Sequence, residues 1–89
     1  MAEKIWSDDA WHSYVEWQTD NKRMLKKIND LLKDIERNGA AKGIGSPEPL
    51  KGNWSGYYSR EINEKDRLVY KMIDGKIYIA QCKGHYDDK

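Results

Sequence analysis

The 89-residue sequence has no phenylalanine, only one cysteine and two prolines, and no long apolar run. The single cysteine, Cys82, cannot form a disulfide within one chain, which is typical of a reducing compartment. No segment stays apolar over the roughly 20 residues that cross a bilayer, and no signal-peptide pattern opens the chain. These absences argue against a disulfide framework and a membrane partner, and we expect a cytoplasmic protein.

An excess of one charge is also lacking, because 16 Lys and Arg face 15 Asp and Glu, for a net charge of +1. The distribution is nevertheless uneven: residues 1–20 hold one lysine and five acids, whereas residues 21–45 hold seven bases and three acids. The near-neutral total argues against indiscriminate binding to nucleic acid, although a local basic surface could still meet phosphates. The bases between residues 22 and 33 are explained more simply as a solvated helix face.

Aromatic residues are abundant, with four Trp and six Tyr. The length suits a single domain over residues 1–89 with one modest core, and each aromatic side chain hides more area than an aliphatic one. Most of them should therefore fill that core. Trp54, Tyr57 and Tyr58 could instead stack on nucleic-acid bases.

Two helices are predicted in the first half of the chain. A short strand, residues 4–6, precedes Ser7, which suits the N-cap of a helix with an acidic first turn. A second helix should begin after Asn21 and end at Gly39, which accepts the left-handed conformation at a helix C-terminus. The apolar positions spaced by three and four should face the core. They are Ala10, Trp11, Tyr14, Val15 and Trp17 in the first helix and Met24, Leu25, Ile28, Leu31, Leu32 and Ile35 in the second.

Three antiparallel strands are predicted in the second half, over residues 57–62, 67–72 and 77–83. Asp74-Gly75 between the last two suits a type I′ hairpin, since both central residues of that turn need positive φ. Two N-terminal helices packed on one face of an antiparallel sheet of four to five strands make an α+β fold.

Alternation along the strands predicts which side chains face the core. The predicted core-facing residues are Leu68, Tyr70 and Met72 in one strand and Tyr78, Ala80 and Cys82 in the next. Arg67, Lys83 and His85 would then lie together on the opposite face of the sheet. A register slip of one residue would undo this assignment.

Residues 39–49 form the one long irregular stretch, and their glycine spacing matches no phosphate-binding or dinucleotide fingerprint. Pro47 and Pro49 fix their own φ angles and favour extended conformations at Ser46 and Glu48. Glu48 should therefore be displayed from a stiff backbone. Alone, such a segment is more often a rigid turn with a solvated acid.

Polar residues outside the predicted core match the needs of metal-free RNA cleavage. They are Glu48, Lys51, Arg67, His85 and Tyr86. A base must take the proton of the ribose 2′-hydroxyl, cations must stabilise charge on the phosphate oxygens, and an acid must protonate the departing 5′-oxygen. Simpler explanations exist: Arg67 could counter Asp66 or Glu64 on the sheet, and the last residues could be a frayed terminus.

Many segments match one family in the same order. They are Ile5-Trp6-Ser7, Trp11, Trp17-Gln18, Lys26-Lys27-Ile28-Asn29, Ile35, Arg37, Gly43-Ile44-Gly45, Pro47-Glu48-Pro49-Leu50-Lys51, Ser55-Gly56, Ser59-Arg60, Arg67-Leu68-Val69-Tyr70 and His85-Tyr86. On these segments the chain resembles the YoeB (Txe) toxins of the RelE-like superfamily. The resemblance implies a microbial-ribonuclease-like fold and a metal-free, cofactor-free endoribonuclease that cuts messenger RNA in the ribosomal A site. It also implies neutralisation by a Phd/YefM-type antitoxin, and commonly a toxin homodimer.

The resemblance also implies roles for individual residues. Glu48 would be the general base and His85 the general acid, Arg67 would stabilise the phosphate, and Tyr86 would position RNA or the acid. The expected RNA-binding residues are Lys51, Arg60 and Lys83.

Glu61 departs from the family pattern, in which a second arginine usually follows the first. If Glu61 faces the RNA, it removes a phosphate contact and adds a repulsion. If it faces away, it could pair with Lys65 or Lys71. Two alternative functions stay open: a ribosome-independent ribonuclease, and a module that has lost catalysis but still binds its antitoxin.

Overall fold

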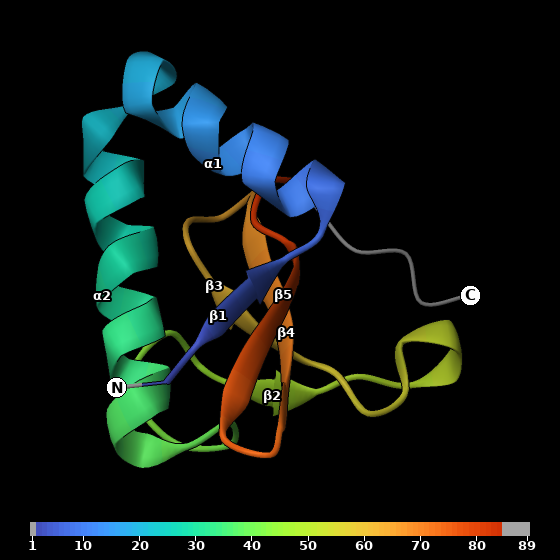
Figure 1. Cartoon of the computed structure of the whole chain (residues 1–89). Coiled ribbons are helices and arrows are strands. Elements are labelled where there is room, and N and C mark those ends of the chain that lie inside the picture. Colours follow the sequence, from blue (N-terminus) through green and yellow to red (C-terminus); the bar gives the residue numbers. More distant parts are fainter. Residues whose placement is uncertain (1, 85–89) are drawn as a thin grey trace.

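The computed structural model describes residues 2–84 as one five-stranded sheet with two helices, shown in Figure 1. The elements in chain order are β1 (Lys4–Trp6), α1 (Asp8–Asp20), α2 (Lys22–Asn38), β2 (Glu48–Pro49), the short 3-10 helix η1 (Gly52–Trp54), β3 (Tyr58–Glu61), β4 (Arg67–Ile73) and β5 (Lys76–Gln81). The strand order is β1-β5-β4-β3-β2, with β1 parallel to β5 and the other neighbours antiparallel. The predicted α+β fold is confirmed, although the sheet is mixed because of β1. His85 and Tyr86 lie outside the described residues.

The helix ends follow the predicted capping residues. The Ser7 hydroxyl accepts a hydrogen bond from the Ala10 N–H (3.0 Å), which satisfies a donor that the helix leaves unpaired. The Asn21 side chain caps α2 in the same way, and Gly39 ends that helix at a φ of 88°. Over residues 2–84, neither helix has both the length and the apolar character needed to cross a membrane.

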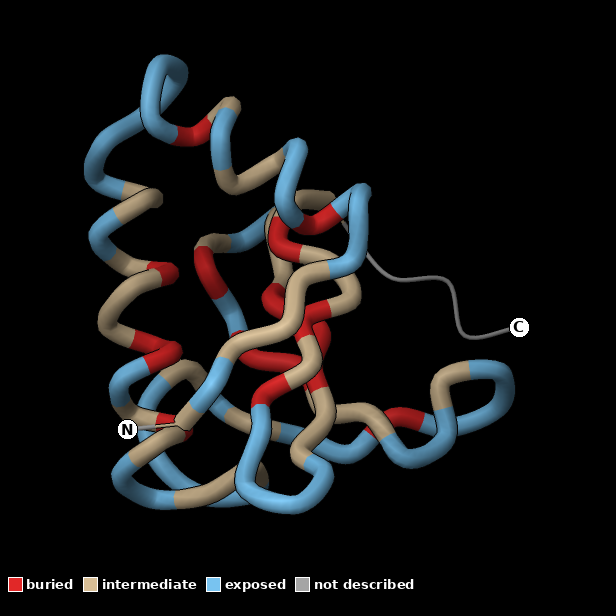
Figure 2. The backbone as a smooth tube through the Cα atoms, viewed as in Figure 1, coloured by how far each residue is buried: buried red, intermediate tan, exposed pale blue. Residues whose placement is uncertain are grey.

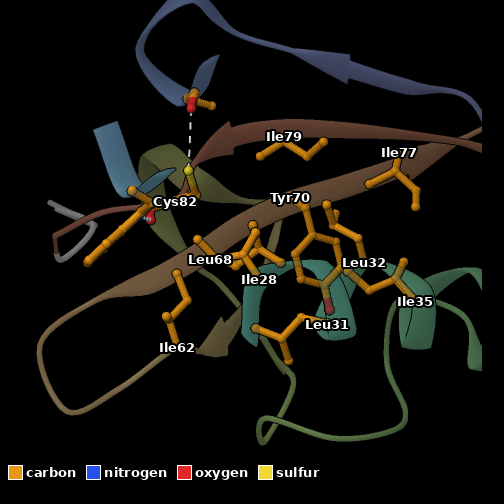
Figure 3. Packing of buried hydrophobic residues seen from close by; sticks show 12 residues of the cluster. Ile28, Leu31, Leu32, Ile35, Ile62, Leu68, Tyr70, Ile77, Ile79 and Cys82 are labelled. Atoms are coloured by element: carbon orange, nitrogen blue, oxygen red, sulfur yellow. Dashed lines mark hydrogen bonds between the residues drawn. The ribbon is translucent and has the colours of Figure 1, made fainter. Parts of the chain in front are cut away.

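The core lies between α2 and the sheet, as the buried segments in Figure 2 show. Four residues of the α2 stripe are buried: Ile28, Leu31, Leu32 and Ile35. They meet Leu68 and Tyr70 of β4 and Ile77 and Ile79 of β5 (Figure 3). The predicted stripe of α2 is therefore confirmed.

Helix α1 contributes less to the core than its spacing predicts. Ala10 and Trp17 are buried, but Trp11 is 51% exposed and Val15 44% exposed, so the prediction is wrong for these two. The reason is that α1 packs beside α2 and against β1 and β5 at one edge of the sheet, which covers only a narrow side of the helix. Trp11 instead packs its ring edge-on against Trp6, with 5.8 Å between the ring centroids.

A bulge in β5 changes the predicted parity of that strand. Tyr70 is opposite Ile79 while Val69 is opposite Gln81, so Ala80 is an extra residue on the β5 side. Ile77 and Ile79 consequently face the core, and the prediction that Tyr78 and Ala80 do so is wrong. Asp74 and Gly75 both have positive φ, at 53° and 76°, as the predicted hairpin turn requires.

Cys82 still reaches the core because the bulge restores the predicted parity after Ala80. Its thiol is fully buried and donates to the Ala10 carbonyl at 3.3 Å, the dashed line in Figure 3. Burial disfavours the thiolate and raises the pKa of Cys82 to about 12. The residue is therefore a small buried apolar group and not a nucleophile.

Candidate functional site

The sheet face that points away from the helices, here called the outer face, carries a row of aligned residues. Glu48 of β2 is opposite Ser59, Ser59 is opposite Val69, and Val69 is opposite Gln81 of β5. Residues directly opposite each other project to the same side of a sheet. This central row therefore places the Glu48 carboxylate on the outer face, level with the middle of β4.

Cations flank the central row on both sides. Every second residue of a strand points the same way, so Arg67, Val69 and Lys71 of β4 share the outer face. Arg67 lies two residues before Val69 on β4, and Lys71 lies two residues after it. Each is therefore about 7 Å from the central row, measured along the strand. On the outer face, the row that ends in Glu48 thus has a cation on each side of it along β4.

Backbone pairing holds Glu48 in place. The two-residue strand β2 pairs with β3, and the Leu50 N–H just beyond it donates to the Tyr57 carbonyl at 2.9 Å. The predicted extended conformation of Glu48 is confirmed, and the residue is exposed. The prediction for Ser46 is wrong, since its φ is 52°. The chain has to turn there, because Gly45 uses its carbonyl to accept the Glu61 N–H (2.8 Å) before β2 begins.

Arg67 shares the outer face with Glu48, but its guanidinium is directed along the sheet to the β3–β4 turn. Nη1 donates to the carbonyls of Asn63 (2.7 Å), Glu64 (3.3 Å) and Asp66 (3.3 Å). Arg67 therefore meets the backbone of the turn instead of its carboxylates. Lys51, just after β2, is exposed and caps η1 without a side-chain hydrogen bond.

The structure corrects the prediction for Arg60. This residue alternates with Ser59 and Glu61 on β3, so it points to the helix side, and it is fully buried. All five N–H donors of its guanidinium are used. Nε donates to the Tyr70 hydroxyl (2.8 Å), Nη1 to Asp34 (2.5 Å) and the Ile44 carbonyl (3.0 Å), and Nη2 to the carbonyls of Gly39 (2.9 Å) and Lys42 (2.7 Å). No donor is left for an RNA phosphate.

The structure also corrects the placement of Lys83. Its ammonium lies 3.3 Å from Glu16 and 3.5 Å from Asp20, over the ring of Trp17. The hydrogen bond to Glu16 is the main reason that the pKa of Lys83 is raised. These contacts hold Lys83 against α1.

Comparison with known proteins decides the family. A family model described as the YoeB-like toxin of bacterial type II toxin-antitoxin systems matches residues 6–86. The chain belongs to the YoeB toxin family. It is 50% identical to the toxin YoeB of Escherichia coli K12 over 82 residues, which cover 92% of this chain and 96% of that one. It is 49% identical to the toxin YoeB of Synechocystis over 77 residues, 86% of this chain and 88% of that one.

Solved structures of the YoeB family match the fold closely. The YoeB–YefM complex of Staphylococcus aureus aligns with a TM-score of 0.91 and 53% identity, over 97% of this chain and 99% of that one. The YoeB dimer of the same species aligns at 0.90 and 53%, over 96% of this chain and 98% of that one. YafQ of E. coli, 20% identical with a TM-score of 0.77 over 96% of this chain and 94% of that one, shows a likeness of fold alone. The chain is thus a type II toxin with a RelE-like fold.

Within this YoeB fold, the register settles the orientation of Glu61. Glu61 is exposed and directly opposite Arg67, so it projects from the outer face. The family's second arginine position is therefore occupied by an acid on the same surface as Glu48.

Two features of this chain were not predicted from its sequence. The role of Arg60 could have been found, because it shares its parity with Ile62, a core residue. No pattern in the sequence predicts the contact of Lys71 with the rings of Tyr57 and Tyr78, since that contact depends on how the strands pair. Within residues 2–84, no group of three or more His, Cys, Asp or Glu side chains is close enough to hold a metal ion.

Proposed function

We propose that this YoeB-family toxin is a metal-independent endoribonuclease that cleaves messenger RNA in the A site of the ribosome. The observation that supports it most is the outer face, where the exposed Glu48 lies level with the middle of β4 between Arg67 and Lys71. An RNA strand across the outer face, passing over the buried Ser59 and Val69, would bring its phosphates to the two cations and a ribose to the carboxylate.

Each proton in the reaction has an assigned group. Glu48 takes the proton of the 2′-hydroxyl, and the 2′-oxygen attacks the adjacent phosphorus as the bond from phosphorus to the 5′-oxygen breaks. The products are a 2′,3′-cyclic phosphate and a 5′-hydroxyl. His85 donates the proton to the 5′-oxygen and Tyr86 positions it, two roles that rest on the family resemblance.

The cations stabilise the charge that builds on the non-bridging oxygens. Arg67 would exchange the carbonyls of the β3–β4 turn for the phosphate, to which a guanidinium binds with two parallel hydrogen bonds. Lys51 assists from the end of β2. Glu61 beside Arg67 weakens this contact without blocking it, because Glu61 is exposed and salt in the solvent screens its charge.

Ribosome dependence follows from the weak charge of the toxin. A net charge of +1 gives little electrostatic capture of free RNA, so the ribosome must present the substrate strand. Relatives of known structure include a complex of YoeB with YefM and a YoeB dimer. By analogy, this toxin is held inactive by a YefM-type antitoxin in the bacterial cytoplasm and forms a homodimer.

The decisive experiment maps the ends of cleaved messenger RNA. Purified toxin is added to ribosomes programmed with a short labelled message, and the new ends are identified chemically. A 2′,3′-cyclic phosphate paired with a 5′-hydroxyl is expected, whereas hydrolysis by metal-activated water would leave a 5′-phosphate. Equal cleavage of free and ribosome-bound RNA would contradict the ribosome requirement.

The catalytic roles are tested by Glu48→Ala and His85→Ala. Each should slow cleavage by about 10²–10⁴-fold, the contribution expected of a general base or acid. Full activity in both variants would remove the proposed acid–base pair. Growth arrest on expression without antitoxin, relieved by Glu48→Ala, would exclude the alternative of a module that only binds its antitoxin.

A further inference from the structure

A small pocket opens on the outer face beside the central row. Its volume is about 200 Å³, and its walls include Ile5 of β1, Tyr57, Lys71 of β4 and Tyr78 of β5. The register explains why these residues meet, because Ile5 is opposite Tyr78 and Tyr78 is opposite Lys71. This group, here called the tyrosine–lysine pocket, therefore forms the row next to Glu48, Ser59, Val69 and Gln81.

The ammonium of Lys71 lies between two aromatic rings. Nζ is 4.8 Å from the ring centroid of Tyr57 and 5.8 Å from that of Tyr78. Cation–π contacts hold the charge in place without neutralising it. Within residues 2–84, Lys71 has no carboxylate at ion-pair distance, unlike Lys4, Lys26, Lys76 and Lys83. Its three N–H donors thus remain available to an anion.

We propose that the tyrosine–lysine pocket binds the nucleotide next to the cleaved bond of the messenger RNA. The base stacks on the ring of Tyr78 or Tyr57, and the phosphate binds Lys71. This inference rests on the proposed function, since it places the substrate on the outer face.

Spacing and chemistry both support a nucleotide in this pocket. The pocket row lies about 7 Å from the row of Glu48, a distance on the scale of one nucleotide in an extended strand. Aromatic rings beside a cation are the elements that bind single-stranded nucleic acid, and stacking tolerates any base because every base has a π-face. The pocket therefore adds affinity at one flanking position without choosing its sequence.

Equilibrium binding of the inactive Glu48→Gln toxin to ribosomes programmed with messenger RNA tests the pocket without using cleavage. In that background Lys71→Gln should weaken binding about tenfold and lower the salt slope by about 0.7, as the loss of one phosphate contact to a single strand predicts. Tyr78→Leu should also weaken binding about tenfold, whereas Tyr78→Phe, which keeps the ring, should bind like its parent.

Two controls separate the pocket from other contacts. Lys26→Gln removes the same charge from an exposed lysine that pairs with Asp30 on helix α2, away from the outer face, and should leave binding unchanged. A message that ends before the A site should remove the difference between Lys71→Gln and its parent. An equal loss with and without the A-site codon would show a contact to ribosomal RNA and overturn the proposal.

Two other outcomes would also overturn it. One is unchanged binding and salt dependence in Lys71→Gln. The other is a weakened antitoxin complex with unchanged RNA binding, which would assign the pocket to an acidic segment of the antitoxin. Failure of the proposed function would give a different result. The toxin would bind the RNA, but the wild-type toxin would not cleave the message.

Discussion

Two carboxylates of the outer face lie opposite different residues. Glu48 is opposite Ser59, whereas Glu61 is opposite Arg67, the cation assigned to the phosphate. A negative charge beside that cation opposes RNA binding through solvent, where one charge at close range is worth about 1 kcal/mol. The proposed phosphate contact of Arg67 should therefore depend on which residue occupies position 61.

Replacing Glu61 by glutamine should accordingly tighten binding to programmed ribosomes by about fivefold, because the repulsion is removed while the shape is kept. The gain should shrink as salt is added. Titration of labelled ribosomes at two salt concentrations measures both effects. Weaker binding of Glu61→Gln would mean that Glu61 makes a favourable contact to the RNA.

Cys82 is a second example at the residue scale, because its burial suppresses the reactivity of its thiol. Because burial raises its pKa to about 12, the thiolate is scarce near neutral pH, and the thiol is also out of reach of a reagent. Iodoacetamide at pH 8 should label the folded toxin at least about 100-fold more slowly than the toxin in denaturant. Mass spectrometry of timed samples checks this, and equal labelling rates would contradict the buried position.

At the scale of elements, Arg60 joins β3 to α2 and to the loop that leads into β2. Its hydrogen bonds reach Asp34 of α2 and three carbonyls between residues 39 and 44. Asp34 in turn accepts the Ile44 N–H at 3.0 Å. The loop before Glu48 is therefore held by one buried guanidinium, which fixes the point from which β2 and the proposed general base begin.

Arg60→Ala should destabilise the toxin by about 3 kcal/mol or more, because several carbonyls and the Tyr70 hydroxyl lose their partner in the interior. Arg37→Ala is the matched control, since Arg37 is an exposed residue of α2. Urea unfolding measures both variants. If Arg60→Ala lowers the free energy of unfolding as little as Arg37→Ala does, the anchoring role of Arg60 is contradicted.

The same contact predicts a dependence of stability on pH. The hydrogen bond from Arg60 is the main cause that holds the pKa of Asp34 below its ordinary value of 3.8. A carboxyl with a lowered pKa in the folded state stabilises the fold above its unfolded pKa, and this stabilisation is lost as the pH falls through the folded pKa. The difference in unfolding free energy between wild type and Asp34→Asn should therefore be largest at neutral pH and shrink below about pH 4. A difference that is constant from pH 7 to pH 3 would contradict this origin.

For the whole molecule, local patterns were enough to predict the fold class. The α2 stripe, the Ser7 and Asn21 caps and the Asp74-Gly75 turn depend on near neighbours in sequence, and all are confirmed. Features that depend on contacts between distant segments were not predictable. The bulge at Ala80 is visible only once β4 and β5 are paired, and the exposure of Trp11 depends on where α1 meets the sheet.

The candidate site also has a part that the sequence could predict and a part that required the fold. Its residue types could be chosen from the sequence and the family, and the shared face of Glu48 and Arg67 agrees with that choice. The burial of Arg60 and the pairing of Lys83 with α1 required the fold. The sequence thus predicted the shared surface of Glu48 and Arg67 better than it predicted which other cations reach that surface.

The cleavage rate of Glu48→Gln on programmed ribosomes tests the central claim most directly. That claim is that the carboxylate on the outer face removes the 2′-hydroxyl proton, and a glutamine of the same shape cannot do so. The account predicts single-turnover cleavage at least about 100-fold slower than wild type, with binding retained, while Glu3→Gln at the opposite edge of the sheet cleaves normally. Cleavage by Glu48→Gln within a few-fold of the wild-type rate would contradict it.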